Sequence, residues 1–241
     1  MEKRYLQLYS IKDETAKDFK AALKKVKEAG YTGVEFAGNY GNMTAPELKA
    51  FLAELGLEAI SAHIVSDMVA QNLDFCAELG LKYIIDPWAN MSTDEEAEAF
   101  AQKLNATGKL CKEKGITFGY HNHAHEFDKS KDGTFMDTLA VNTDPDLVCF
   151  QLDVGWVVNA GHDPVAFINK YPGRTKLIHV KEWDKEKEWV VAMGKGSVDW
   201  PAVRDAALAN NAEGFVVERE DDYAGSIYTC IEEDCAYLKT L

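Results

Sequence analysis

The chain has 241 residues, with 26 lysines and arginines against 40 aspartates and glutamates, so its formal net charge is −14. A content of 46% hydrophobic and 27% charged residues is typical of a folded globular protein and excludes disordered and fibrous classes. The acidic balance disfavours a nucleic-acid surface, because phosphate binding depends on clustered lysine and arginine. We therefore expect a self-repelling, soluble surface and no nucleic-acid partner.

The sequence gives no indication of export or of a membrane partner. The opening residues, MEKRYLQLYS, contain no apolar run of signal-peptide length, and no uncharged apolar stretch approaches the ~20 residues of a membrane span. The five cysteines form no CxxC pair and are odd in number, and a chain of this size needs no disulfides. We therefore expect a cytoplasmic protein with reduced thiols.

Short β-like runs alternate with amphipathic helical patterns along the whole chain. In chain order, strands are predicted at 5–11, 31–36, 57–63, 81–86, 116–121, 147–153, 175–180 and 214–220. Helices are predicted between and after them, at 15–29, 45–55, 68–79, 93–114, 135–141, 164–170, 200–210 and 227–238. Eight strands thus alternate with eight helices.

Local chemistry agrees with these boundaries. Thr44, followed by Pro46 and Glu47, makes a capping box, and glycines such as Gly56 and Gly80 stand just after helical patterns. Strands that alternate with helices pair in parallel through right-handed crossovers. A doubly wound open sheet is the alternative, but eight units without an internal linker favour one α/β domain over residues 1–241, a single (β/α)8 TIM barrel.

Almost every predicted strand ends in an ionisable residue, about every 30 residues along the chain. Alone, each such residue has a structural explanation, as a cap of the next helix or a partner of a loop carbonyl. In a barrel, however, all of them point into the mouth at the carboxyl ends of the strands, and clustered carboxylates and imidazoles need a compensating cation or polar ligand. We therefore predict a divalent metal site for Mn, Co, Mg or Zn. The residues are Glu35, His63, Asp86, His121, Asp153, His179 and Glu218.

Seven segments in this order resemble the xylose-isomerase-like TIM barrel superfamily. Within it, the resemblance is closest to the sugar phosphate isomerase/epimerase group, with its HNHxxEF and DxxW signatures. The segments are GYTGVEF at 30–36, SAH at 61–63, YHNHAHEF at 120–127, LDVGWVVNAGHDP at 152–164, LIHVKEWD at 177–184, GKGSVDW at 194–200 and VVERE at 216–220.

The resemblance implies a metal held by Glu, Asp, His and Glu at the ends of strands five to eight. Three of these ligands carry over directly, as Asp153, His179 and Glu218. At strand five the usual Glu is replaced by His121, so the fourth ligand is either His121 or Glu126 from the following loop.

The chemistry implied by the resemblance is proton transfer next to a carbonyl, through an enediolate. It requires a Lewis acid for the developing oxyanion and a base beside the carbon-bound proton. Glu218 is the predicted base, and His121 or His123 is the predicted second acid/base. We expect a sugar or sugar phosphate isomerase/epimerase, with a metal-dependent lyase or dehydratase acting on a keto-sugar or keto-inositol as the alternative.

Other residues are predicted to line the substrate site. Trp88 and Trp156 follow strand ends, where an aromatic face can stack on a sugar ring, with simple packing as the alternative. Lys181 lies two residues after His179 on the same strand face and can polarise a substrate oxygen or bind an anion, with a surface ion pair as the alternative. Glu35 and His63 are predicted to bind hydroxyls or to support the ligands. Glu126 is placed in the same site.

Two further segments and two further functions remain open. If the strand extended past His121, then His123 and His125 would share its face, and the GKGS segment at 194–197 offers backbone amides to a phosphate or makes a plain turn. An endonuclease IV-like nuclease would need a histidine where Trp156 stands, and a non-catalytic carbohydrate-binding barrel would not need the three ligands. The expected partner is a small-molecule sugar or sugar phosphate. Many members of the family that the chain resembles form dimers or tetramers, so a homo-oligomer and a monomer both stay open.

Overall fold

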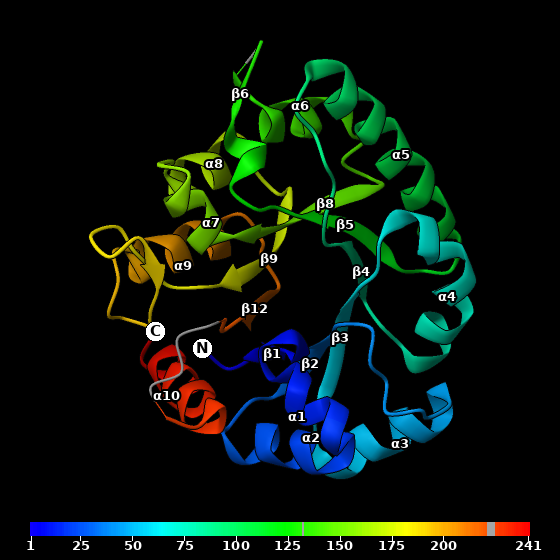
Figure 1. The fold of residues 1–241 in the computed structure, drawn as a ribbon. Coiled ribbons are helices and arrows are strands. Elements are labelled where there is room, and N and C mark those ends of the chain that lie inside the picture. Colours follow the sequence, from blue (N-terminus) through cyan, green and yellow to red (C-terminus); the bar gives the residue numbers. More distant parts are fainter. Residues whose placement is uncertain (132, 221–224) are drawn as a thin grey trace.

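Eight parallel strands close into a barrel that helices surround (Figure 1). The computed structural model describes residues 1–131, 133–220 and 225–241. Around the barrel the strand order is β1-β12-β9-β8-β5-β4-β3-β2, so neighbours in the barrel follow the chain order. The barrel strands are β1 (Tyr5–Gln7), β2 (Gly33–Phe36), β3 (Glu58–His63), β4 (Tyr83–Asp86), β5 (Thr117–His121), β8 (Val148–Asp153), β9 (Thr175–Val180) and β12 (Gly214–Val217). The predicted single (β/α)8 barrel is confirmed.

Helices connect successive strands and cover the outside of the barrel (Figure 1). They are α1 (Lys12–Lys17), α2 (Phe19–Glu28), α3 (Ala45–Leu55), α4 (Ser66–Leu79), α5 (Asp94–Glu113), α6 (Phe135–Asn142), α7 (Val154–Asn159), α8 (Pro164–Lys170), α9 (Trp200–Ala209) and α10 (Ile227–Thr240). Two 3-10 helices, η1 (Leu8–Ile11) and η2 (His125–Phe127), and two small hairpins complete the described elements. The hairpins pair β6 (Lys129–Ser130) with β7 (Gly133–Thr134) and β10 (Trp183–Asp184) with β11 (Trp189–Val190). Among the described residues, no helix combines the length and the hydropathy that a membrane crossing requires.

The strand predicted at 5–11 is wrong in its second half, since β1 ends at Gln7 and η1 follows it. Two helices also differ from the sequence prediction, because an aspartate begins each of them. The helix predicted at 15–29 is broken at Asp18, whose extended backbone and side chain cap α2 by accepting a hydrogen bond from the Ala21 N–H at 3.0 Å. The sequence prediction places no helix between Asp153 and Pro164, but Asp153 caps α7 by accepting from the Trp156 N–H at 2.9 Å. Asp153 therefore both ends a strand and begins a helix.

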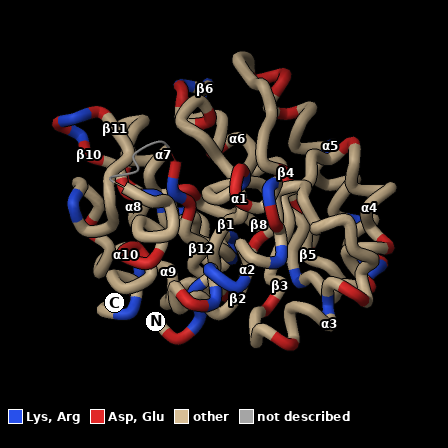
Figure 2. The backbone as a smooth tube through the Cα atoms, turned by 60° about the horizontal axis from the view of Figure 1, so that its bottom comes forward, with Lys and Arg blue, Asp and Glu red and all other residues tan. Residues whose placement is uncertain are grey.

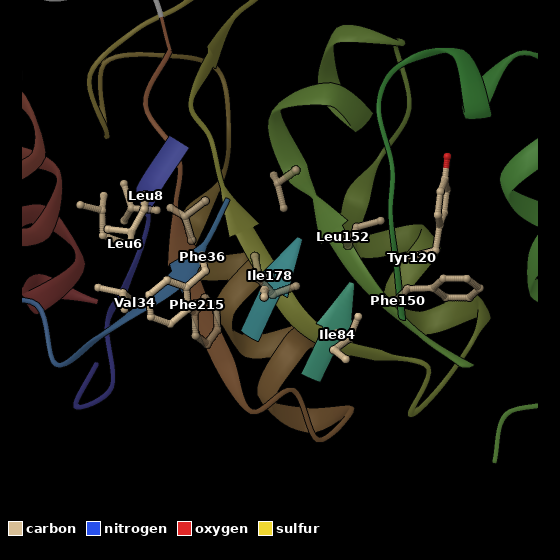
Figure 3. Close-up of a cluster of buried hydrophobic side chains, with 14 of the residues drawn as sticks. Leu6, Leu8, Val34, Phe36, Ile84, Tyr120, Phe150, Leu152, Ile178 and Phe215 are labelled. Atoms are coloured by element: carbon tan, nitrogen blue, oxygen red, sulfur yellow. The ribbon is translucent and has the colours of Figure 1, made fainter. Parts of the chain in front are cut away.

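Strand side chains alternate between the helices outside and the barrel interior, as the two-residue period of a strand requires. Outward-facing residues such as Val34, Phe150, Ile178 and Phe215 join the large core cluster between strands and helices (Figure 3). A smaller cluster fills the amino-terminal end of the barrel, and it consists of Tyr5, Ile60, Tyr83, Ile85, Cys149, Leu177 and Val216. The barrel is therefore plugged by apolar side chains below its mouth.

Above this plug, the inward-facing side chains are polar yet buried. Gln7, Glu35, Gln151 and His179 are each fully buried. By contrast, Figure 2 shows acidic and basic residues spread over the outer helices and loops, where water solvates them. The fold thus concentrates a buried polar layer at the carboxyl ends of the strands, where active sites of this fold are built.

Candidate metal centre and active site

The four predicted metal ligands meet at the mouth of the barrel. His121 ends β5, Asp153 ends β8, His179 lies on β9, and Glu218 follows β12. One ligand atom from each residue lies within 4.8 Å of the others, and all four residues are buried. Parallel pairing produces this convergence, since Asp153 is in register with His179 and the Glu218 N–H donates to the Val180 carbonyl at 3.2 Å. Between the alternatives for the fourth ligand, the structure brings His121 into the cluster.

Glu35 on β2 anchors the polar layer. Its Oε1 accepts from Gln7 Nε2 at 2.8 Å and from His179 Nε2 at 2.7 Å. Its Oε2 accepts from Ser61 Oγ at 2.5 Å and from Gln151 Nε2 at 2.6 Å. Burial disfavours the charged carboxylate, but His63 and His179 outweigh burial and hold the pKa of Glu35 well below its ordinary value. Glu35 is therefore an anion that only accepts hydrogen bonds, which orients every group around it.

Gln151 on β8 links Glu35 to His121 and fixes which ring nitrogen of His121 carries the proton. Because Glu35 requires a donor, the Gln151 amide presents Nε2 to Glu35, and its Oε1 faces His121 Nδ1 at 3.2 Å and His63 Nε2 at 2.7 Å. An amide oxygen can only accept, so the proton of His121 lies on Nδ1 and Nε2 keeps its lone pair. Burial and the neighbouring histidines, His179 first, lower the pKa of His121 well below its ordinary value. His121 is thus a neutral imidazole with a lone pair, as a metal ligand must be.

His179 is prepared in a similar way by Glu35. With its Nε2–H donated to Glu35, its Nδ1 faces Asp153 Oδ2 at 3.6 Å and Glu218 Oε2 at 3.4 Å. Within the described part of the chain, His179 Nδ1 and Asp153 Oδ2 are buried polar atoms without a hydrogen-bond partner. Burial opposes a charged His179, but Glu35 and Glu218 overcome it and raise its pKa well above the ordinary value. Carboxylates and imidazoles converging on unpartnered buried atoms fit a divalent cation, which would supply the positive charge that a proton on His179 otherwise supplies.

Lys181, which follows β9, is buried beside the ligands. Its side chain is only 1% exposed, so the alternative of a surface ion pair is wrong. Its Nζ lies 2.9 Å from Glu218 Oε2, 2.8 Å from Glu220 Oε2 and 3.6 Å from Asp153 Oδ2. Although burial disfavours its charge, Glu218 and Asp153 raise the pKa of Lys181. Lys181 is therefore an ammonium held against the predicted base, and it packs over the Trp156 ring at 4.8 Å.

The three alternating histidines do not share a strand face, because β5 ends at His121. His125 lies in η2, where its Nε2 contacts the Ala89 carbonyl at 2.8 Å. His123 stays at the site, and burial lowers its pKa to about 4, so it is neutral at physiological pH. Glu126 is fully buried outside the ligand cluster, since the Tyr120 hydroxyl and the His123 N–H, at 2.8 Å, donate to its carboxylate. Glu126 therefore positions His123 and does not reach the four ligands.

The GKGS segment surrounds a carboxylate of the protein itself. Glu182 accepts hydrogen bonds from Gly194 N–H at 2.9 Å, Val198 N–H at 3.2 Å and Trp200 Nε1 at 2.7 Å. A Cβ on Gly196 would lie 2.4 Å from Glu182 Oε1, which explains the glycine there. The hypothesis that these amides bind a phosphate is wrong, because the amides of Gly194, Lys195 and Ser197 already donate to Glu182 and to the Ala192 and Trp183 carbonyls.

A cavity of about 610 Å³ opens at the mouth above the ligands. Its lining includes His63, Trp88, His121, His123 and Glu218, which were all predicted site residues. Trp156 is half-buried behind them, with its ring 5.6 Å from that of His123. Asp86 has a structural role instead, since it accepts a hydrogen bond from the Ser66 N–H, at 2.8 Å, at the start of α4.

Sequence reasoning missed four polar residues of this site. They are Gln7, Ser61 and Gln151, which contact Glu35, and Glu220, which contacts Lys181. A usable signal existed for two of them. Gln151 stands two residues before Asp153 and Glu220 two residues after Glu218, so each shares a strand face with a predicted ligand.

Comparison with known proteins places the chain in a family. Residues 23–241 match the model of the xylose isomerase-like TIM barrel family, and the chain belongs to it. It is 28% identical to inosose dehydratase 2 of Bacillus cereus over 90% of this chain and 83% of that protein. It is also similar to the crystal structure of a sugar phosphate isomerase/epimerase from Parabacteroides distasonis, with 28% identity and a TM-score of 0.87 over 99% of this chain and 94% of the other.

A more distant solved structure, of a protein named IOLI with a bound zinc atom, is 13% identical to the chain. Its TM-score is 0.77 over 99% of this chain and 97% of the other. At that identity, the similarity shows the shared fold alone.

Proposed function

We propose that the chain is a metal-dependent dehydratase that removes water from a keto-sugar or a keto-inositol. The observation that carries this proposal is the contact of 2.9 Å between Glu218 Oε2 and Lys181 Nζ, deep in the mouth of the barrel. It places a carboxylate base and an ammonium acid on one side of the cluster, the arrangement that a syn elimination uses. The similarity to inosose dehydratase 2 supports the same reaction.

We assign metal binding to four residues and removal of the substrate proton to one of them. His121, Asp153, His179 and Glu218 would hold a divalent ion, which supplies a Lewis acid for the carbonyl oxygen when bound. The bound zinc of the distant IOLI structure is consistent with such an ion. Glu218, with its pKa held well below the ordinary value by Lys181 and His179 against the effect of burial, is ionised and able to accept a proton.

The proposed elimination balances within the Glu218–Lys181 pair. Glu218 removes the proton from the carbon next to the carbonyl, and Lys181 Nζ donates a proton to the hydroxyl on the adjacent carbon. The C–H and C–O bonds break, a C=C bond forms, and water leaves. The proton on Glu218 then passes across the 2.9 Å contact to Lys181 and restores both groups.

Isomerisation or epimerisation is the second candidate, and it shares the first proton transfer. It is favoured by the similarity to the Parabacteroides distasonis structure. It is also favoured by His123, whose Nδ1 is a buried atom that lacks a partner among the residues described. A second acid/base here would have to be a neutral imidazole, because position 121 carries no carboxylate.

Turnover in heavy water by the manganese-loaded protein separates the two reactions. With a keto-inositol as substrate, we expect NMR to show an unsaturated product and loss of one water molecule. Deuterium incorporation into an isomer without loss of water would instead support isomerisation or epimerisation.

Variants test the two assigned residues. Glu218→Gln and Lys181→Met are each expected to lower the turnover number at least a hundredfold, the low end of general acid–base effects. Glu213→Gln, just before the start of β12, and the exposed Lys185→Met are matched controls that should keep turnover. Full activity of Glu218→Gln would rule out the assigned base.

A further inference from the structure

Large apolar side chains gather at the mouth of the cavity. Tyr9, Val65, Met68 and Trp88 are 41–48% exposed, and all four line the same cavity as His121 and Glu218. They come from η1, the β3–α4 connection, α4 and the segment after β4, so four separate parts of the fold contribute to one patch. An exposed apolar patch beside a reactive centre marks a binding surface.

Trp88 is held in place with part of its surface open. Its ring packs against His123, with ring centroids 4.6 Å apart at 73°, and against His125 at 4.8 Å. The backbone N–H of Trp88 donates to Asp86 Oδ1 at 3.2 Å. The side chain is nevertheless 48% exposed. A fixed aromatic surface of this kind binds a flat apolar group without an ordering cost.

The cavity is larger than a simple sugar requires. A hexose has twelve heavy atoms. If each of them is given the volume of a water molecule in the liquid, about 30 Å³, the sugar fills about 360 Å³. The cavity measures about 610 Å³. The cavity therefore has room for a sugar ring and a substituent of ring size, and its lining includes the apolar patch.

The charge of the lining disfavours a phosphate at this mouth. Among the described residues, the lining includes Glu218 and Glu220 and contains no lysine or arginine. Lys181, behind the lining, is shared between three carboxylates. A substrate phosphate would therefore find no lysine or arginine in the lining, and the carboxylates of Asp153 and Glu218 already balance the charge of the proposed divalent ion.

We infer that the substrate is an uncharged sugar derivative carrying a flat apolar substituent, which lies on Trp88, Val65 and Met68 while the sugar ring lies over His121 and Glu218. This inference rests on the proposed function for the sugar ring. A sugar whose anomeric carbon carries such a substituent has no free aldehyde. The carbonyl next to which Glu218 acts must then be a ring ketone.

Binding measurements on the manganese-loaded full chain test the inference independently of turnover. The probes are phenyl β-D-glucoside, methyl β-D-glucoside, glucose and glucose 6-phosphate, each titrated by calorimetry. We expect the phenyl glucoside to bind at least tenfold more tightly than the methyl glucoside and glucose 6-phosphate to bind more weakly than glucose. Equal affinity of the two glucosides, or tighter binding of the phosphate, would overturn the inference.

A pair of tryptophan variants locates the effect. Trp88→Ala should reduce the phenyl-to-methyl affinity ratio below threefold. Trp189→Ala, which removes a tryptophan of similar exposure, 51%, outside this cavity, should keep the full ratio. A ratio that survives in Trp88→Ala would contradict the assignment of the surface. If the original chain kept the phenyl-to-methyl affinity ratio but released no water from a keto-sugar or keto-inositol, the proposed dehydratase activity would be wrong and the binding surface would stand.

Discussion

Replacing Gln151 by leucine tests how the site prepares His121 for a metal. The side chain donates to Glu35 Oε2 at 2.6 Å and accepts from His121 Nδ1 at 3.2 Å and His63 Nε2 at 2.7 Å. In Gln151→Leu, Glu35 keeps its other donors and His63 keeps Glu35 Oε1 at 3.1 Å, but the His121 Nδ1–H loses its acceptor. We expect one buried, unpaired donor to cost about 1–3 kcal/mol of unfolding free energy.

The larger expected effect is on metal affinity. Without the amide oxygen, the proton of His121 is free to move from Nδ1 to Nε2, which removes the lone pair from the ligand position. Loss of a partner that orients a ligand lowers metal affinity by about 10- to 100-fold. Cobalt titration followed by visible absorbance measures the affinity, and imidazole ¹⁵N shifts report the position of the proton.

Gln7→Leu is the matched control for this prediction. Gln7 also donates to Glu35, at 2.8 Å, and it accepts from the Tyr9 N–H, but neither bond reaches a histidine. We expect a similar loss of stability with cobalt affinity within threefold of the original chain. Unchanged affinity in Gln151→Leu, or an equal loss in both variants, would refute the reasoning.

Two further predictions concern stability. Burial, only partly offset by Arg219, raises the pKa of Asp234 from 3.8 to about 6. The folded state therefore holds the carboxyl proton more tightly than the unfolded state. The protein loses this stabilisation as the pH rises from 3.8 to about 6. Relative to Asp234→Asn, the unfolding free energy should fall by about 3 kcal/mol between pH 4 and pH 7 in urea titrations, and a constant difference would contradict this. Gly196→Ala should cost about 1–3 kcal/mol, because its Cβ would meet Glu182; an unchanged melting temperature would show that the loop accommodates it.

The barrel and the ligand cluster could be predicted because strand ends recur with one period. Each ligand terminates a run of buried apolar residues, and in a closed parallel barrel those ends converge without any knowledge of side-chain contacts. Trp88 was likewise placed at the site by its position after a strand, and Lys181 by its spacing of two residues from His179. The sequence could not decide between His121 and Glu126, because the choice depends on where β5 ends and on the Tyr120 hydroxyl that holds Glu126.

Contacts between distant strands were beyond prediction from one sequence. The Glu35–Gln151 bond joins residues 116 positions apart and is set by packing across the barrel. The phosphate hypothesis for the GKGS segment was wrong for the same reason, since its Gly194 and Ser197 amides donate to Glu182 and to the Trp183 carbonyl, in a different part of the chain. Helix boundaries at Asp18 and Asp153 were missed because aspartate suits both helix caps and helix-adjacent loops.

The central claim is that four residues of the barrel mouth hold one divalent ion. Anomalous diffraction from crystals soaked in manganese or cobalt tests it directly. We predict a single strong peak bound by His121 Nε2, Asp153, His179 Nδ1 and Glu218. A peak bound by other residues, or no peak at these four at saturating metal, would contradict the account.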